Sequence, residues 1–266
     1  MNAQLDKDEI LRAVRAERGR TTAFLRTLEP AQWETEALPG WRIREVVAHL
    51  ISLDVSAVNG TILPVAVGSM DKLERWNDRQ VGKRANKRPS ELLLALERWG
   101  PRFVRLARII PSRLYQVRMP TIWGREPGGL LIWSRAYDEW IHRQDMRRAL
   151  GLPDEDADLA SVGSFMMQAG AAVIMPALAG RGGTVELRLE GVPIPRHVFD
   201  LTRQRLIAGS GGHHGDARIR ADAPAAFVMS AAGRASTFAE LQDRGDLTVE
   251  GDDTLAKEFL DRFRVV

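Results

Sequence analysis

Residues 137–145 read Tyr-Asp-Glu-Trp-Ile-His-Arg-Gln-Asp, a polar cluster inside a segment whose other residues favour a buried helix. The segment runs from about residue 130 to residue 150 and ends at Gly151. Because an α-helix turns once in about 3.6 residues, Asp138, His142 and Asp145 fall on one of its faces. A carboxylate and an imidazole one turn apart can bind the same metal ion. The stretch therefore predicts a core helix that carries part of a metal site.

A second histidine stands in residues 41–50, which read Trp-Arg-Ile-Arg-Glu-Val-Val-Ala-His-Leu. Val46, Leu50 and Leu53 form the apolar stripe of a helix that starts near residue 43 and carries His49. Two facing helices can bring His49 and His142 to one ion, with one carboxylate and an open position for water or substrate. Such a ligand set suits Zn²⁺, and also Fe²⁺, Mn²⁺ or Ni²⁺.

Two neighbouring acids compete for the role of the carboxylate ligand. Asp138 lies about 40° from His142 around the helix, and Glu139 lies about 60° from it on the other side. We rank Asp138 first and keep Glu139, which has the longer reach, as its rival. In the alternative interpretation the polar residues form a solvated face whose acids pair locally with Arg135 and Arg143. Spacing alone leaves both interpretations open.

Composition sets the broad class. The chain has 266 residues, of which 44% are apolar and 27% charged, and its net charge of +3 is too small to indicate a nucleic-acid partner. It contains no cysteine, so disulfides and a protein thiol nucleophile are excluded. The charged amino terminus does not resemble a signal peptide, and the apolar run of residues 169–180 is interrupted by Pro176. We expect a cytoplasmic protein without a membrane span.

Periodicity predicts two domains, and the seven tryptophans all lie at or before Trp140. Helical spacing of apolar residues predicts four long helices of an up-and-down bundle, at about residues 6–28, 43–59, 91–110 and 130–150. After an acidic linker at residues 154–156, a helix that is apolar nearly all round is expected at about 159–175. Alternating residues then predict strands at 184–190, 217–220 and 246–250, with covering helices at about 225–232 and 254–263. The predicted domains are residues 1–156 and, as a small α+β domain, residues 157–266.

Two other polar segments are weaker candidates for a site. The passage from Arg75 to Arg88 is basic and is expected to be a turn-rich, solvated loop; a second possibility is that some of its cations attract an anionic substrate. His213 and His214 stand among glycines and predict a flexible turn between strands.

Three motifs resemble a known family. Residues 41–50 resemble the GW-(T/S)-x-R-(D/E)-V-V-A-H-L segment of the mycothiol-dependent maleylpyruvate isomerase family, within the DinB-like bundle superfamily. Residues 138–151 are similar to its E-x-W-x-H-x-x-D-(I/M)-R-R-A-L-G helix. Residues 232–234, followed by 247–252, are similar to the closing G-R … V-x-G-D pattern of the attached sterol-carrier-like domain. The resemblance implies a DinB-like four-helix bundle followed by a sterol-carrier-like α+β domain.

The resemblance also implies a chemistry. The metal ligands would be His49, His142 and the acid four residues before it, which is Asp138 where the family usually has glutamate. In the family a divalent metal, usually zinc, binds the sulfur of mycothiol, and coordination lowers the pKa of that thiol. Addition of the thiolate turns a cis double bond into a rotatable single bond, and elimination gives the trans isomer. Related bundle proteins transfer the thiol to electrophiles.

Two further residues receive roles from the resemblance. Arg234 would bind a carboxylate of the substrate or of the thiol cosubstrate, or alternatively cap a helix at the surface. Asp145 would orient His142 from outside the ligand set or pair with a nearby arginine, or be purely structural. We expect a cytoplasmic, metal-dependent isomerase or thiol transferase, monomeric or homodimeric, that acts on a small, anionic electrophile. A thiol-independent bundle enzyme and a non-catalytic lipid-binding or small-molecule-binding protein are the alternatives.

Overall fold

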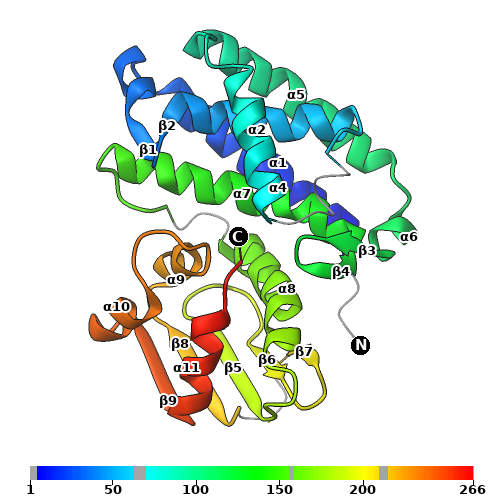
Figure 1. Cartoon of the computed structure of the whole chain (residues 1–266), viewed down its shortest axis with the longest axis vertical. Helices are drawn as coiled ribbons and strands as arrows, with labels where there is room; N and C mark the ends of the chain where they lie inside the picture. Colours follow the sequence, from blue (N-terminus) through cyan, green and yellow to red (C-terminus); the bar gives the residue numbers. More distant parts are fainter. Residues whose placement is uncertain (1–4, 63–69, 156–158, 210–214, 266) are drawn as a thin grey trace. The chain divides into compact units, whose positions relative to one another are not determined.

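The computed structural model describes residues 5–62, 70–155, 159–209 and 215–265 (Figure 1). The chain forms two compact units, one of which is Leu5–Asp154 while the other begins at Glu155. The predicted domain boundary between residues 156 and 157 lies outside the described residues. The predicted turn at His213 and His214 lies outside them as well.

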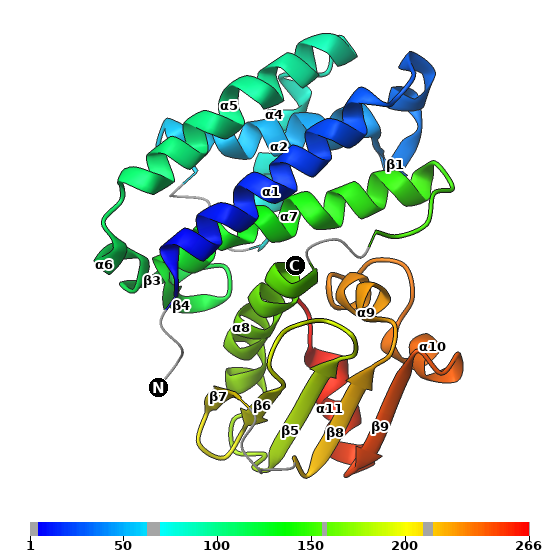
Figure 2. The same ribbon diagram turned by 180° about the vertical axis from the view of Figure 1, so that it is seen from behind.

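The first unit is built on the predicted four-helix bundle. Its long helices are α1 (Lys7–Arg26), α2 (Ile43–Val58), α5 (Pro89–Ile109) and α7 (Gly128–Ala149). Helices α5 and α7 both pack against α1 and also against α2, so the four helices close around one core (Figures 1 and 2). This arrangement places α2 and α7, which carry the predicted histidines, beside each other.

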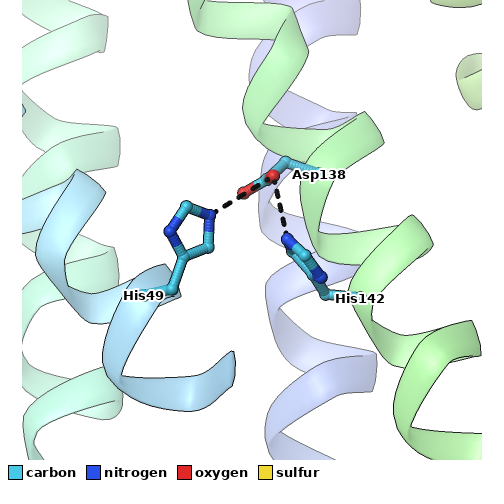
Figure 3. Close-up of side chains that lie close together, drawn as sticks. All are labelled: His49, Asp138 and His142. Carbon is cyan, nitrogen blue, oxygen red and sulfur yellow. Dashed lines mark ion pairs between the residues drawn. The ribbon is translucent and has the colours of Figure 1, made fainter. Parts of the chain in front are cut away.

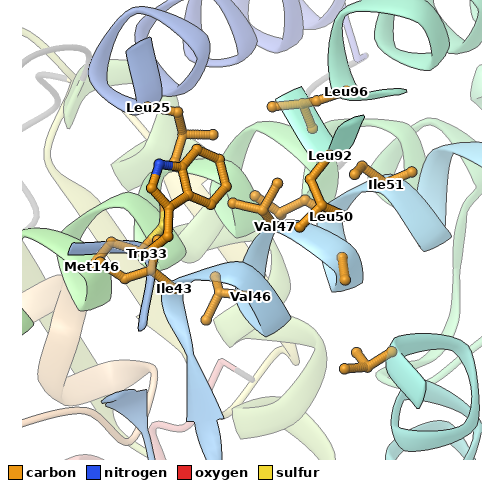
Figure 4. Packing of buried hydrophobic residues seen from close by; sticks show 12 residues of the cluster. Leu25, Trp33, Ile43, Val46, Val47, Leu50, Ile51, Leu92, Leu96 and Met146 are labelled. Atoms are coloured by element: carbon orange, nitrogen blue, oxygen red, sulfur yellow. The ribbon is translucent and has the colours of Figure 1, made fainter. Parts of the chain in front are cut away.

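Apolar side chains from all four long helices fill the interior of this bundle (Figure 4). Ile43, Val46 and Leu50 of α2 are completely buried, and Met146 of α7 joins them. Burying one such side chain contributes roughly 1.5–3 kcal/mol to stability. The apolar stripe of α2 therefore fixes the rotation of that helix, and with it the direction in which His49 points.

Local sequence sets the ends of the helices. Asp6 caps α1 by accepting the backbone N–H groups of Asp8 and Glu9. Glu45 accepts the backbone N–H of Arg42 at 2.9 Å at the start of α2. Helix α7 ends before Gly151, which adopts a φ of 69° that favours glycine.

The basic passage was expected to be a loop, and that prediction is wrong for most of its length. Residues Met70–Gly82 form helix α4, which packs against α2. Trp76 and Val81 are buried on its inner side, while the arginines and lysines lie on the outside. Two buried apolar residues are enough to hold a largely polar helix against a neighbour.

Short elements join the bundle helices. A 3-10 helix, η1 (Pro30–Glu34), precedes a small hairpin of β1 (Glu36–Leu38) and β2 (Trp41–Arg42). Helix α6 (Ser112–Tyr115) precedes a second hairpin of β3 (Arg118–Thr121) and β4 (Gly124–Pro127). The first hairpin leads directly into α2, and the second leads directly into α7.

The second unit is an α+β domain, as predicted. Its sheet contains β5 (Thr184–Leu189), β6 (His197–Asp200), β7 (Arg205–Ala208), β8 (Ala217–Ala221) and β9 (Leu247–Gly251), in the order β7-β6-β5-β8-β9. Its helices are α8 (Leu159–Ala177), α9 (Pro224–Ala231), α10 (Phe238–Asp243) and α11 (Asp253–Arg262). Among the described strand pairs of this sheet, β5–β8 is parallel and the other three are antiparallel. Helix α11 packs on one face of the sheet (Figures 1 and 2). The predicted strands correspond to β5, β8 and β9, whereas β6 and β7 were not predicted.

Helix α8 is the apolar helix expected after the linker. Within the described residues it is the one helix long and apolar enough to cross a membrane, but 61% of its apolar window is buried inside the protein, as in the core helix of a soluble domain. Gly170 allows Phe263 to pack directly on its backbone, because a Cβ atom there would lie 2.3 Å from the Phe263 ring.

Candidate metal centre

Three predicted ligands meet in the bundle unit (Figure 3). His49 extends from α2, and Asp138 and His142 extend from α7. One potential ligand atom of each residue lies within 4.8 Å of the others. Asp138 Oδ1 is 3.7 Å from His49 Nε2 and 3.4 Å from His142 Nε2. The atoms therefore surround a space of the size that one metal ion occupies.

Burial distinguishes this cluster from a solvated helix face. The side chains of His49 and His142 are each 7% exposed, and that of Asp138 is 28% exposed. The alternative interpretation predicted that Arg135 and Arg143 pair with the acids of this cluster. Arg135 does bind Asp138, but Arg143 binds Glu17 on α1, at 2.6 Å. The cluster is thus a buried site with a partly open acid.

The three residues influence one another's charge. Burial lowers the pKa of His49, which favours a neutral imidazole with a lone pair to donate. Burial also opposes the charged form of His142, but Asp138 and Asp145 outweigh it and raise the pKa of His142 to about 9. Burial alone would raise the pKa of Asp138, yet His142 and Arg135 hold it well below its usual range. The acid is a carboxylate at neutral pH.

Glu139, the rival of Asp138, points into a separate network of buried charges. Arg18 of α1 donates from Nε to Glu139 Oε1 at 2.7 Å and from Nη1 to Asp54 Oδ2 at 2.5 Å. Arg135 Nη2 lies 3.4 Å from both Glu139 Oε1 and Asp54 Oδ1. Glu139 and Asp54 are fully buried in this network. Glu139 is therefore held away from the histidines.

Arg135 joins this network to the metal-site cluster. It donates from Nη1 to Asp138 Oδ2, which leaves Oδ1 as the oxygen that faces the histidines. The network and Asp138 together set three carboxylates against two guanidinium groups. The raised pKa of His142 shows that Asp138 and Asp145 favour a positive charge at this position, and two imidazoles with a carboxylate are a ligand set for a divalent transition metal.

Two other residues fix the orientation of the histidine rings. Asp145 Oδ2 lies 3.0 Å from His142 Nδ1, so that Nε2 is the nitrogen turned toward Asp138. The ring of Trp41 packs against His49 with the ring centres 5.4 Å apart. Asp145 is therefore in contact with His142, and its role as an orienting residue stays a prediction.

Arg234, the other predicted site residue, lies in the second unit. It follows α9, and its backbone N–H donates to the carbonyl of Met229 at 2.8 Å in the turn that Gly233 makes with a φ of 71°. The side chain is half-buried. Its predicted contact with substrate or cosubstrate stays a prediction.

The charge network was missed from the sequence. Arg135 precedes Asp138 by three positions, so helical spacing gave a usable signal for that pair. Arg18 contacts Glu139 across 121 positions, and Arg135 contacts Asp54 across 81. Such long-range partners have no signature in a single sequence.

Comparison with known proteins agrees with this geometry. A family model described as the mycothiol maleylpyruvate isomerase N-terminal domain matches residues 14–147. A crystal structure of the mycothiol-dependent maleylpyruvate isomerase matches with a TM-score of 0.53 and 19% identity, covering 87% of this chain and 91% of that one. A histidine-to-alanine mutant of that enzyme matches with a TM-score of 0.53 and 18% identity, covering 92% and 93%. Comparison with curated proteins found no match. The family model covers half of the chain, including His49 on α2 and His142 on α7. The chain therefore belongs to the mycothiol maleylpyruvate isomerase N-terminal domain family.

Proposed function

We propose that this protein is a metal-dependent enzyme that uses a low-molecular-weight thiol, mycothiol, for cis–trans isomerisation of a small electrophile or for transfer of the thiol to it. The observation that carries the proposal is the convergence of His49, Asp138 and His142, with ligand atoms within 4.8 Å of one another. Membership of the family and the fold shared with the isomerase support it.

The residues present fit a divalent metal, most simply Zn²⁺. His49 and His142 would each supply Nε2, and Asp138 would supply Oδ1. When bound, such an ion lowers the pKa of a coordinated thiol, so that a thiolate nucleophile is available at neutral pH. Three protein ligands leave a coordination position open for that thiol. The chain has no cysteine, so the thiol has to come from outside the protein.

The protein's own residues then act by positioning. Arg135 turns Asp138 toward the ion, and Asp145 fixes the ring of His142. The largely buried histidines limit the access of water to the site. Arg234 is proposed to hold a carboxylate of the substrate or of mycothiol. We propose that the enzyme works in the cytoplasm on a small, anionic electrophile.

The test is elemental analysis of the purified protein beside His49→Ala and His142→Ala, each checked for folding by circular dichroism. We expect about one equivalent of a transition metal in the wild type and almost none in the variants. His197→Asn, which removes a buried histidine from β6, is the matched control and should keep its metal. Wild type without metal, even after incubation with zinc, would refute the proposal.

Turnover then separates the thiol-dependent reaction from its alternatives. Metal-loaded wild type should isomerise maleylpyruvate only when mycothiol is added. Turnover of an electrophile without thiol would instead indicate a thiol-independent bundle enzyme. Binding of an apolar ligand that survives the loss of both histidines, with no turnover, would indicate a carrier.

A further inference from the structure

A cavity lies within the bundle unit, between α2 and α4, with a volume of about 520 Å³. Ser56 lines it from the C-terminal half of α2, Asn59 from the position just after that helix, and Trp76 from α4. Lys83 and Arg84, which follow α4, complete the wall. The volume is within the range of small-molecule sites. No acidic residue lines the cavity within the described part of the chain.

Arg84 is the unusual member of this lining. Its side chain is half-buried, and it donates from Nη1 to Ser52 Oγ at 2.8 Å and to the carbonyl of Gln80 at 3.2 Å. Burial lowers its pKa, because no carboxylate among the described residues offsets the withdrawal of its charge from water. A guanidinium in that position is stabilised by an anion from solution.

The geometry also indicates the kind of anion. Nη1 is occupied by protein acceptors, whereas the edge formed by Nε and Nη2 has no partner among the described residues. That edge matches the two oxygens of a carboxylate. Trp76 and Val55 provide an apolar wall for a short carbon skeleton. We propose that this cavity binds a small molecule through its carboxylate group, with Arg84 as the anchor and Lys83 as a second cation at the entrance.

The cavity stands on the same side of α2 as the candidate metal centre. At about 100° per residue, Ser52 and Ser56 lie within roughly 60° of His49 around the helix axis, and Ser56 lies about 10 Å farther along it. The proposal places the carboxylate of a short molecule at Arg84, on the side of α2 that also carries His49. This step rests on the proposed function, and it makes Arg84 a positioning residue for an anionic electrophile.

The experiment is a calorimetric titration of maleate into the full-length protein after its metal has been removed. Without metal, a carboxylate cannot bind by coordination, and the difference between wild type and Arg84→Gln separates binding in the cavity from binding at Arg234. We expect wild type to bind maleate and Arg84→Gln to bind it at least about tenfold more weakly, as for the loss of a charged, bidentate contact. Arg79→Gln is the matched control: it removes the same charge from an exposed position on α4 outside the lining, and should bind like wild type.

Three outcomes would overturn the proposal. These are unchanged binding in Arg84→Gln, an equal loss in Arg79→Gln, and inorganic sulfate binding as tightly as maleate, which would refute the assignment to a carboxylate. If Arg84→Gln fails to fold because its contact with Ser52 is lost, Lys83→Gln decides, since Lys83 is exposed and its loss should also weaken binding. Maleate binding in a protein that never takes up metal would refute the proposed function and leave the cavity assignment standing.

Discussion

Arg135 holds one carboxylate oxygen of Asp138 and thereby turns the other toward His49 and His142. Arg135→Gln should weaken metal binding by about 10–100-fold, the usual effect of losing a group that orients a ligand. Competition with a chelating dye measures the affinity.

The control is Glu17→Gln. Glu17 on α1 and Arg143 on α7 form a fully buried ion pair, and the pair of Arg18 and Glu139 joins the same two helices. The Glu17→Gln substitution should destabilise the bundle by roughly 3 kcal/mol without changing metal affinity. Equal metal affinity in Arg135→Gln and wild type would contradict the role of Arg135.

Substitutions of the adjacent acids Asp138 and Glu139 on α7 should have opposite effects on metal binding and on stability. Asp138→Asn should lose metal, because it removes the carboxylate that faces the histidines. Glu139→Gln should keep its metal but lose roughly 3 kcal/mol of unfolding free energy, because Arg18 and Arg135 lose a buried partner. Metal analysis and urea denaturation of the two variants check this. Loss of metal in Glu139→Gln, with metal kept in Asp138→Asn, would make Glu139 the ligand.

Asp145 should affect the metal through its contact with His142. An asparagine side chain can present its amide NH₂ instead of an acceptor to Nδ1, so Asp145→Asn should weaken metal binding by about 10–100-fold. Asp145→Glu keeps the charge and should recover part of the affinity. A purely structural role predicts instead that both variants change the unfolding free energy and leave metal affinity as in wild type.

The second unit should lose stability in mild acid because of His197. Burial lowers the pKa of this residue to about 4, outweighing its hydrogen bond with the Pro195 carbonyl, while the unfolded chain titrates near 6.5. Between these values the unfolded state binds a proton that the folded state does not, so the stabilisation is complete above pH 6.5 and is lost as the pH falls toward 4. From pH 7 to pH 5 the loss is roughly 2 kcal/mol. Denaturant titrations at both pH values measure it.

The comparison for this pH effect is His197→Gln, which cannot titrate. Its unfolding free energy should depend less on pH over the same interval, whatever its absolute stability. An identical pH dependence in the variant and the wild type would show that another group is responsible.

The sequence predicted those parts of the site that depend on helical periodicity. The spacing of Asp138 and His142 on α7, and the position of His49 beside the apolar stripe of α2, put the candidate ligands on two helices. Spacing alone left the solvated-face interpretation open, and the family resemblance favoured the metal site. The choice between Asp138 and Glu139 could not be made, because it depends on Arg18, which lies 121 positions before Glu139 and donates to its Oε1. Partners this distant become neighbours only when the chain has folded.

The fold likewise contains elements that could be predicted from the sequence and elements that could not. Strands β5 and β8 alternate between buried and more exposed residues, which made them predictable. Strand β6 has four residues and all four are buried, so it lacks the alternation that identifies a strand. Helix α4 was missed because charge dominates its composition, although Trp76 and Val81 attach it to the bundle.

The neighbouring positions of Asp138 and Glu139 have a consequence for how this helix tolerates change. Asp138 faces the candidate metal centre, and Glu139 is held by arginines in the interior. The two residues together therefore fix the rotation of α7 about its axis. Inserting or deleting a single residue between Asp138 and His142 would rotate one relative to the other by about 100°. Relatives of this protein can therefore vary the chemistry of individual side chains along this turn, but its length has to stay constant.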